Sequence, residues 1–284
     1  MEGGPSGAWP HQPADQHGLR PGHTRNERFS MARIGFLGTG EIAAALVETM
    51  AGDGHQITLS RRSETVSQHL ANRFAGVNRA ENQQVLDNSD IVFICLLADT
   101  ARQLLPELHL RPDQTVISVM ARVSIAELQT LCAPATDICA AIPLPPISLG
   151  GTPLAAYPDN AALRHLLGRH ATIHICASET DLAAHFAATG ILLPLLDQID
   201  SAAEWLASFT GDRNSATQYL AGLIGGYCRM LDQTPDLPRL RQGLSTEGGL
   251  NQTLSRKLAD CGTPQALTQG LDSLRSGLNL PPKG

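Results

Sequence analysis

The sequence lacks three features that would each identify a whole class of protein. Its 27 acidic side chains outnumber 21 basic ones, so the basic surface that nucleic-acid binding requires is not expected. No apolar run approaches the roughly 18 residues of a membrane helix, because the longest candidate, 191–196, is short and contains Pro194. The six cysteines form no CxxC pair. We therefore predict a cytoplasmic protein with reduced thiols, no metal, and no nucleic-acid or membrane partner.

Residues 1–30 differ from the rest of the chain in composition. They are rich in Gly, Pro, His and polar residues, and they have no apolar period. They also lack the apolar core of a secretory signal. We predict a disordered extension, or a leader that is foreign to the natural product, because Met31 directly opens the first structured segment.

Residues 31–177 alternate between apolar, β-branched runs and helical patterns. We expect a packed core, since 42% of the chain is hydrophobic, and a mainly parallel sheet with crossover helices. This is a Rossmann-type α/β domain. The three prolines of 142–146 predict a rigid loop at a strand end, where parallel sheets bind ligands. The expected strands are 33–37, 56–60, 90–95, 115–119, 137–142 and 172–177, and the expected helices include 41–50, 63–75, 99–108, 124–132 and 159–169.

Residues 178–284 show helical patterns only, at 182–206, 215–231 and 263–278, with Pro194 expected to kink the first. The apolar faces of these helices are wide for so small a domain. Either the helices cover one another, or helices from two chains interleave in a dimer. The residue pattern alone leaves both open.

The strongest local motif is a glycine turn between the first strand and the first helix. It reads Gly38-Thr39-Gly40-Glu41-Ile42-Ala43, a G-x-G-x-x-A in its required strand–turn–helix context. Gly38 permits the tight turn, Gly40 lets the backbone approach a pyrophosphate, and the amides of the helix start hold the charge. We predict dinucleotide binding by residues 38–42.

The end of the second expected strand indicates which dinucleotide is bound. An enzyme that prefers NAD usually has Asp or Glu here to hold the ribose hydroxyls. This chain has Ser60, Arg61 and Arg62 instead, and cations and hydroxyls suit a 2′-phosphate. We predict NADPH as cofactor, ahead of NADH.

With these motifs in place, the sequence resembles the pyrroline-5-carboxylate reductase family from about Met31 to Leu278. The resemblance rests on "IGFLGTGEIAAAL", "SDIVFICL", "VISVMARVSIAEL", "AAIPLPP" and "STEGGLNQTLSRKLADCG". It implies a Rossmann domain that binds NAD(P)H and an all-helical domain that dimerises by interleaving with its partner, with larger rings as an extension. It also implies an active site between the two domains.

The resemblance further implies roles for individual residues. The loop that in the family binds the imino acid corresponds to Thr246, Glu247, Gly248, Gly249, Leu250 and Asn251. Asn251 and Thr246 would position the substrate, the glycine amides would bind a carboxylate, and Leu250 would border it. Glu247 is either a charge partner of a protonated imine or a solvent-facing acid. Leu96, Leu97 and Met120 would border the cofactor, and Pro143 the substrate.

The chain also departs from the family pattern. Glu41-Ile42 replaces Asn-Met, no Lys-Pro turn follows the strand that ends near Leu96, and the 142–146 loop has lost its polar side chains. Arg122 stands where glycine is expected. These changes leave the substrate open among cyclic imines.

Three functions are compatible with these residues. The first is NADPH-dependent reduction of a cyclic imine, such as pyrroline-5-carboxylate to proline. The second is a β-hydroxyacid dehydrogenase, which needs a catalytic lysine on the first long helix of its C-terminal domain, whereas 181–209 contain no lysine. The third is an NADP-binding sensor that has lost catalysis. We expect the first.

Overall fold

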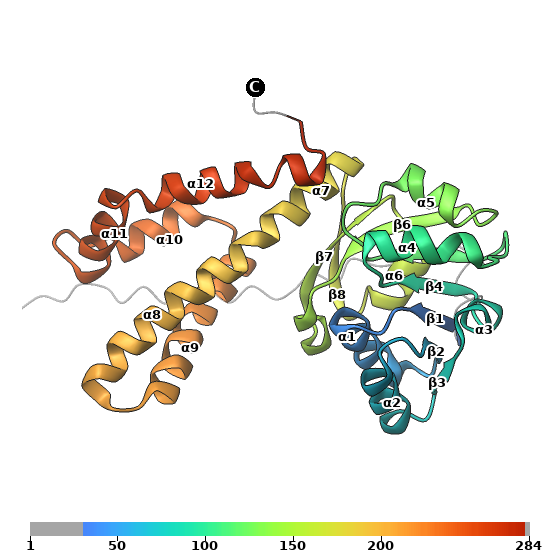
Figure 1. The fold of residues 1–284 in the computed structure, drawn as a ribbon. Coiled ribbons are helices and arrows are strands. Elements are labelled where there is room, and N and C mark those ends of the chain that lie inside the picture. The colour runs from blue at the N-terminus through green and yellow to red at the C-terminus, as the bar shows by residue number, and fades with distance from the viewer. Residues whose placement is uncertain (1–30, 282–284) are drawn as a thin grey trace, which may run out of the picture.

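The computed structural model describes residues 31–281, so the expectation for residues 1–30 lies outside the described residues. The chain forms two parts that Figure 1 shows side by side. All strands lie in the first part, which ends with β8 at Ile175, and only helices follow from Glu179 onward. The predicted class, a Rossmann-type α/β region followed by an all-helical region, is confirmed.

One eight-stranded sheet organises the first part, in the order β3-β2-β1-β4-β5-β6-β7-β8. The first six strands are parallel, β7 pairs antiparallel with β6, and β8 pairs parallel with β7. The strands are β1 (Arg33–Leu37), β2 (Gln56–Ser60), β3 (Val77–Ala80), β4 (Ile91–Ile94), β5 (Thr115–Ser118), β6 (Asp137–Ile142), β7 (Thr152–Tyr157) and β8 (Ala171–Ile175).

Helices cover both faces of the sheet, which is why its central strands are apolar on both sides. One core lies around Phe36 and Phe93, whose rings stack 4.8 Å apart, and a second lies around Leu37, Val92 and Val116. The helices are α1 (Glu41–Met50), α2 (Glu64–Arg73), α3 (Asn82–Asp87), α4 (Ala98–Leu104), α5 (Ile125–Leu131) and α6 (Ala161–Leu167).

Three local expectations for the sheet need correction. The short strand β3 was not predicted, because only Val77 and Ala80 of its four residues are buried. Strand β7 was not predicted either, and it carries Pro153. The 142–146 segment is not wholly a loop, because β6 ends at Ile142 and the prolines at 145 and 146 open a 3-10 helix, Pro145–Leu149. Proline suits that position, where its missing N–H has no partner to lose.

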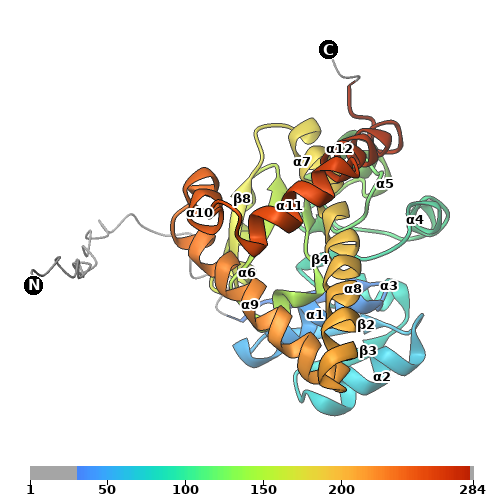
Figure 2. The same cartoon turned by 90° about the vertical axis from the view of Figure 1, so that its left-hand side faces the viewer.

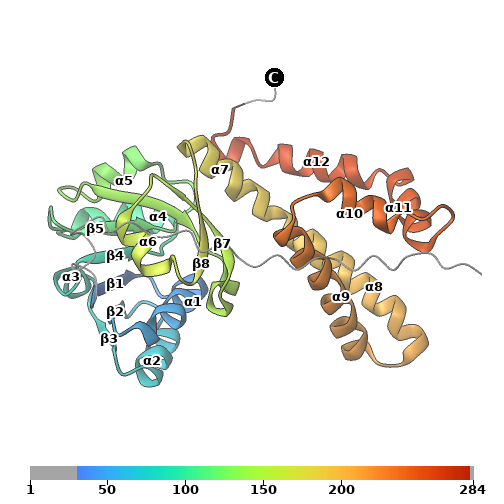
Figure 3. The same cartoon turned by 180° about the vertical axis from the view of Figure 1, so that it is seen from behind.

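The helical part extends away from the sheet (Figures 1 and 3). Its first long pattern is interrupted by a 3-10 turn, Thr189–Ile191, and Pro194 lies in the first turn of the helix that follows, where proline is tolerated. Helices α8 and α9 pack along each other, as all three views show. The helices are α7 (Glu179–Ala188), α8 (Leu192–Thr210), α9 (Arg213–Gln233), α10 (Leu237–Leu244), α11 (Leu250–Asp260) and α12 (Thr263–Ser273), followed by the 3-10 turn η6 (Ser276–Leu278).

The helical part buries very little of its apolar surface within one chain. Between Leu192 and Leu278, only Ala203 and Ala216 are buried. Large apolar side chains stand exposed on α8 and α9, and they include Leu193, Leu196, Trp205, Phe209, Tyr219 and Leu223. The alternative that these helices cover one another is therefore wrong for a single chain. Contiguous exposed apolar surface of this kind marks an interaction site.

Candidate functional site

The carboxyl ends of β1, β2, β4, β5 and β6 lie at one edge of the sheet, because these strands are parallel. The strand order reverses direction between β1 and β4, and such a switch point is where open α/β sheets bind ligands. The glycine turn opens there, between β1 and α1.

The two glycines of the turn serve different purposes. Gly38 has φ +90°, and a Cβ at that position would collide with the backbone carbonyl of Cys95. Gly40 is the N-cap of α1 and receives no side-chain cap, and a Cβ there would meet nothing within 4 Å. The turn therefore needs Gly38 for its own shape, whereas the space beside Gly40 is open for a ligand.

Two hydrogen bonds join this turn to the end of β2. Gly38 N–H donates to Ser60 Oγ at 2.9 Å, and Thr39 Oγ1 donates to the Ser60 carbonyl at 2.7 Å. Both Ser60 and Thr39 are 1% exposed. The side chains of these two predicted cofactor residues thus hold the turn in place.

The next two predicted cofactor residues begin α1. Glu41 is exposed in the first turn, and Ile42 is partly buried and packs against the main core. The carboxylate of Glu41 interacts favourably with the dipole of α1. It lies at the same end of the helix that would attract a phosphate.

Arg61 and Arg62 line a groove of about 560 Å³ together with Glu81, Thr100 and Glu107. Arg61 makes an ion pair with Glu81 at 3.1 Å, and Arg62 Nη2 donates to Thr100 Oγ1 at 3.4 Å. The Arg61 and Glu81 side chains are 57% and 70% exposed, and exposed pairs contribute little, so Arg61 can exchange Glu81 for a phosphate. The groove lies beside the ends of β2 and β3, adjacent to the glycine turn.

The later strand ends are less polar. Leu96 and Met120 are each 9% exposed, Leu97 is 80% exposed at the start of α4, and Pro143 is buried. Burial raises the pKa of the Cys95 thiol beside this edge, so it stays protonated and does not serve as a nucleophile.

The predicted substrate loop joins α10 to α11 and lies far from the glycine turn. Figures 1 and 3 show these helices at the end of the molecule away from the sheet. Asn251 lines a groove of about 740 Å³ between α10 and α11 that also contains Arg241 and Arg256. Thr246 and Glu247 are exposed, and Leu250 is 91% exposed. A single chain therefore does not bring the predicted catalytic and cofactor residues together.

The two glycine amides of this loop already have acceptors. Gly248 N–H donates to Gln252 Oε1 at 3.1 Å, and Gly249 N–H donates to the Thr246 carbonyl at 2.9 Å. Gly248 has φ +67°, which explains the need for glycine there. The amides assigned to a substrate carboxylate are thus engaged within the loop.

Two residues that the sequence does not predict as site residues line a cavity at the ends of β5 and β6. Glu179 begins α7, and Asn279 follows η6 with φ +54°. No local motif marks either residue, because they reach this edge only through the packing of the C-terminal segment on α7. Arg122 lines the same cavity. The one sequence signal for this cavity is that position 122 has arginine where the resemblance implies glycine.

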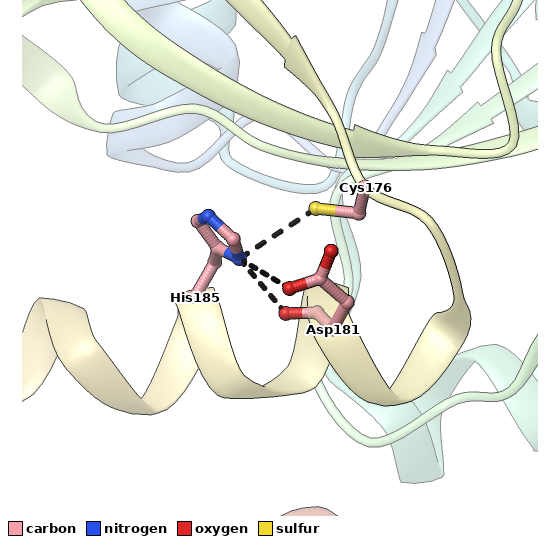
Figure 4. A group of neighbouring side chains, drawn as sticks. All are labelled: Cys176, Asp181 and His185. Atoms are coloured by element: carbon pink, nitrogen blue, oxygen red, sulfur yellow. Dashed lines mark hydrogen bonds and ion pairs between the residues drawn. The ribbon is translucent and has the colours of Figure 1, made fainter.

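Within residues 31–281, Cys176, Asp181 and His185 form the one group of three or more side chains that could hold a metal (Figure 4). His185 Nδ1 lies 3.7 Å from Cys176 Sγ and 2.9 Å from the Asp181 carbonyl oxygen. Asp181 Oδ2 accepts from Ala177 N–H at 3.0 Å, and Ser178 Oγ accepts from Asp181 N–H at 3.1 Å. These contacts cap α7, so the group has an ordinary structural explanation.

Comparison with known proteins agrees with this geometry. Residues 33–122 match the family model described as NADP oxidoreductase, coenzyme F420-dependent. Over 248 residues the chain is 25% identical to a pyrroline-5-carboxylate reductase of Corynebacterium melassecola, covering 82% of this chain and 92% of that protein.

Solved structures show the same fold. A 1-pyrroline-5-carboxylate reductase from Streptococcus pyogenes superposes with a TM-score of 0.73 at 18% identity, covering 87% of this chain and 99% of that one. A pyrroline carboxylate reductase from Plasmodium falciparum with NADP bound gives 0.73 at 16% identity, covering 86% and 95%. The resemblance predicted from the motifs is confirmed: this chain is similar to pyrroline-5-carboxylate reductases in sequence and in fold over most of its length.

Proposed function

We propose that the protein is an NADPH-dependent reductase of a cyclic imine, with pyrroline-5-carboxylate as the first substrate to test. The observation that carries the proposal is the glycine turn at the carboxyl edge of the sheet, open beside Gly40. The similarity to a pyrroline-5-carboxylate reductase over 92% of that protein supports the reaction class.

The residues at this edge fit a nicotinamide dinucleotide. The first amides of α1 lack a side-chain cap and can donate to a pyrophosphate, which approaches without meeting a side chain at Gly40. Arg61 and Arg62 are placed in a groove next to the turn and suit the 2′-phosphate of NADPH. The NADP named for the Plasmodium falciparum structure supports this choice.

The cofactor and the residues around it have separate roles in this proposal. The cofactor, when bound, supplies the hydride. In our proposal Asn251 and Thr246 hold the imine by hydrogen bonds, and Glu247 stabilises its protonated form. Leu96, Met120 and Pro143 supply the apolar surroundings that exclude water.

We propose that the active site is completed by a second chain. The glycine turn and the 246–251 loop lie at different ends of one chain, so the loop of a partner would have to approach the cofactor edge. The exposed apolar surface of α8 and α9 suits such a dimer, because a partner would bury it. Larger rings built from such dimers are an extension of the same proposal.

The stretch Glu179–Thr210 is also long and apolar enough, by length and composition alone, to cross a membrane, with a mean hydropathy of 1.4. We attribute this apolarity to the dimer surface, since Leu193, Leu196 and Trp205 in this stretch are exposed in one chain. A cytoplasmic location belongs to the same proposal.

A second function, an NADP-binding sensor without catalysis, is favoured by one observation. The edge near the nicotinamide end of the site offers mostly apolar side chains, among them Leu96, Met120 and Pro143. Firm NADPH binding without turnover of any imine would support it.

The test is NADPH oxidation with a panel of cyclic imines, measured beside NADH. We expect turnover of at least one imine and a preference for NADPH. Arg61→Ala with Arg62→Ala should lower the affinity for NADPH about 10- to 100-fold and leave that for NADH nearly unchanged. Arg164→Ala, at an exposed position of α6, is the matched control. An unchanged cofactor preference in the double variant would remove the 2′-phosphate assignment.

A further inference from the structure

Two residues other than glycine have positive φ in residues 31–281, and both line the same cavity. Arg122 has φ +65° and Asn279 has φ +54°. The cavity, of about 90 Å³, lies at the carboxyl ends of β5 and β6. Non-glycine residues in this conformation are held there by their surroundings, and they cluster at functional sites.

The backbone of Arg122 is held by a neighbour. Arg102 Nη2 donates to the Arg122 carbonyl at 3.4 Å, and Arg102 is itself fixed by an ion pair with Glu127 at 2.7 Å. Arg122 thus has the backbone conformation that glycine adopts most easily, and it carries a cation there.

The guanidinium of Arg122 lies at the junction of the two parts of the chain. A Cβ on Gly277 would be 3.4 Å from Arg122 Nη2, so the side chain rests against η6. It also borders a second cavity of about 320 Å³, whose lining includes Thr189, Ser273 and Ser276. The position combines a cation with hydroxyl-bearing side chains.

Arg122 has no carboxylate partner among the described residues, whereas several other arginines of the sheet-containing part have one. Arg33 pairs with Asp90, Arg102 with Glu127 and Arg164 with Asp159. An arginine left without an acid, on a constrained backbone at a ligand-binding edge, has the properties of an anion receptor.

The remainder of the cavity suits a small, largely apolar ligand. Its walls include Met120, Ile142, Leu182, Phe186 and Leu278. Glu179 also lines it, with Oε1 accepting from Ile125 N–H at 2.8 Å. One cation and one acid around apolar walls match a small zwitterion such as a protonated imino acid or its amine product.

We propose that Arg122, assisted by Asn279, binds the carboxylate of the substrate and sets the preference for carboxylated imines. The inference rests on the proposed imine reduction. In this proposal the substrate carboxylate is bound by Arg122, which follows β5. It is not bound by the amides of 248–249, because these already donate to acceptors within their own loop.

The test compares two imines that differ only in the carboxylate, pyrroline-5-carboxylate and 1-pyrroline, in the full-length protein. Arg122→Gln should lower kcat/KM for the carboxylated imine about 10- to 100-fold, mainly through KM, and leave 1-pyrroline nearly unchanged. Arg122→Gly should do the same with an unchanged or higher melting temperature, because glycine accepts the φ without strain. Arg164→Gln, at an exposed position of α6, is the matched control.

Binding of L-proline and of pyrrolidine by the NADP-loaded protein, measured by calorimetry, separates this inference from the proposed function. Without turnover of any imine, loss of proline binding in Arg122→Gln alone still supports the receptor. The receptor is overturned if Arg122→Gln leaves both proline affinity and the imine preference unchanged, or if Arg164→Gln causes the same loss.

Discussion

Gly38 N–H and Ser60 Oγ form a buried hydrogen bond of 2.9 Å that joins the phosphate-binding turn to the end of β2. The Ser60 carbonyl accepts a second bond, from Thr39 Oγ1 at 2.7 Å. One residue thus fixes the turn and begins the segment that carries Arg61 and Arg62. Hydrogen bonds to Ser60 therefore join the region expected to hold the pyrophosphate to the region expected to hold the 2′-phosphate.

Replacing Ser60 by Ala should weaken both folding and cofactor binding. The Gly38 N–H would lose its acceptor in a buried position, which costs about 1–3 kcal/mol. We expect a lower free energy of unfolding in urea and a higher Kd for NADPH. Ser63→Ala is the control, since the Ser63 hydroxyl makes no cap hydrogen bond to α2. Equal stability of Ser60→Ala and the wild type would show that this bond does not support the turn.

The two motif glycines should respond differently to alanine. Gly38→Ala places a Cβ against the Cys95 carbonyl at φ +90°, so we expect a loss of about 2 kcal/mol or more of stability. Gly40→Ala meets open space, so stability should fall by at most about 1 kcal/mol, the cost of alanine at an N-cap, while NADPH binding weakens about tenfold. Thermal unfolding and calorimetry measure the two effects. Retained NADPH affinity in Gly40→Ala would mean that the phosphate does not approach there.

Much of this fold could be predicted because the signals are local. The alternation of apolar strands with helices, and Gly38 and Gly40 between a strand and a helix, follow from short-range steric and burial rules. Strand β7 was missed because its pairing with β6 is antiparallel and half-exposed, with Pro153 in its sequence. Its position depends on tertiary contacts.

The site could be predicted only in pieces. Positions 38–42 and 60–62 lie at one sheet edge because parallel strands end together, and their binding of a cofactor stays a prediction. The loop at 246–251 was identified by resemblance, yet nothing in the sequence shows how far it lies from that edge in one chain. The roles of Glu179 and Asn279 as cavity residues depend on how the C-terminal segment packs on α7.

The exposed face of α8 and α9 should hold two chains together. Leu196 and Leu223 are 59% and 46% exposed in one chain, and a carboxylate at either would be unpaired once buried in an interface. Leu196→Glu with Leu223→Glu should convert a dimer to a monomer in light scattering, whereas exposed Gln198→Glu should not. A wild-type monomer, or a double variant that remains dimeric, would contradict this assignment.

His55 should make the protein less stable in mild acid. It is 5% exposed, its Nδ1 accepts Ala32 N–H at 3.2 Å, and burial lowers its pKa below the ordinary value of 6.5. The folded state therefore keeps it neutral while the unfolded chain protonates. Its contribution is complete above about pH 6.5 and declines as the pH falls below that value, by at most about 1.4 kcal/mol per pH unit.

The measurement is urea unfolding at pH 7.5 and at pH 5.5 for the wild type and for His55→Asn, which keeps an acceptor for Ala32. The difference between the two pH values should be smaller in the variant. The neighbouring Asp53 has a lowered pKa, so its contribution is lost only below its ordinary value of 3.8 and does not interfere. An equal pH dependence in both proteins would exclude His55 as its source.

The proposal that two chains build each active site is tested most directly by mixing two inactive variants. Gly40→Asp places bulk and negative charge where the pyrophosphate would bind, and Asn251→Ala removes the proposed substrate contact at the far loop. Each should be folded and inactive alone. Unfolded and refolded together in equal amounts, they should regain about one quarter of wild-type activity, because half of the dimers are mixed and each carries one intact site. Mixed dimers that form but show no activity would contradict a site shared between chains.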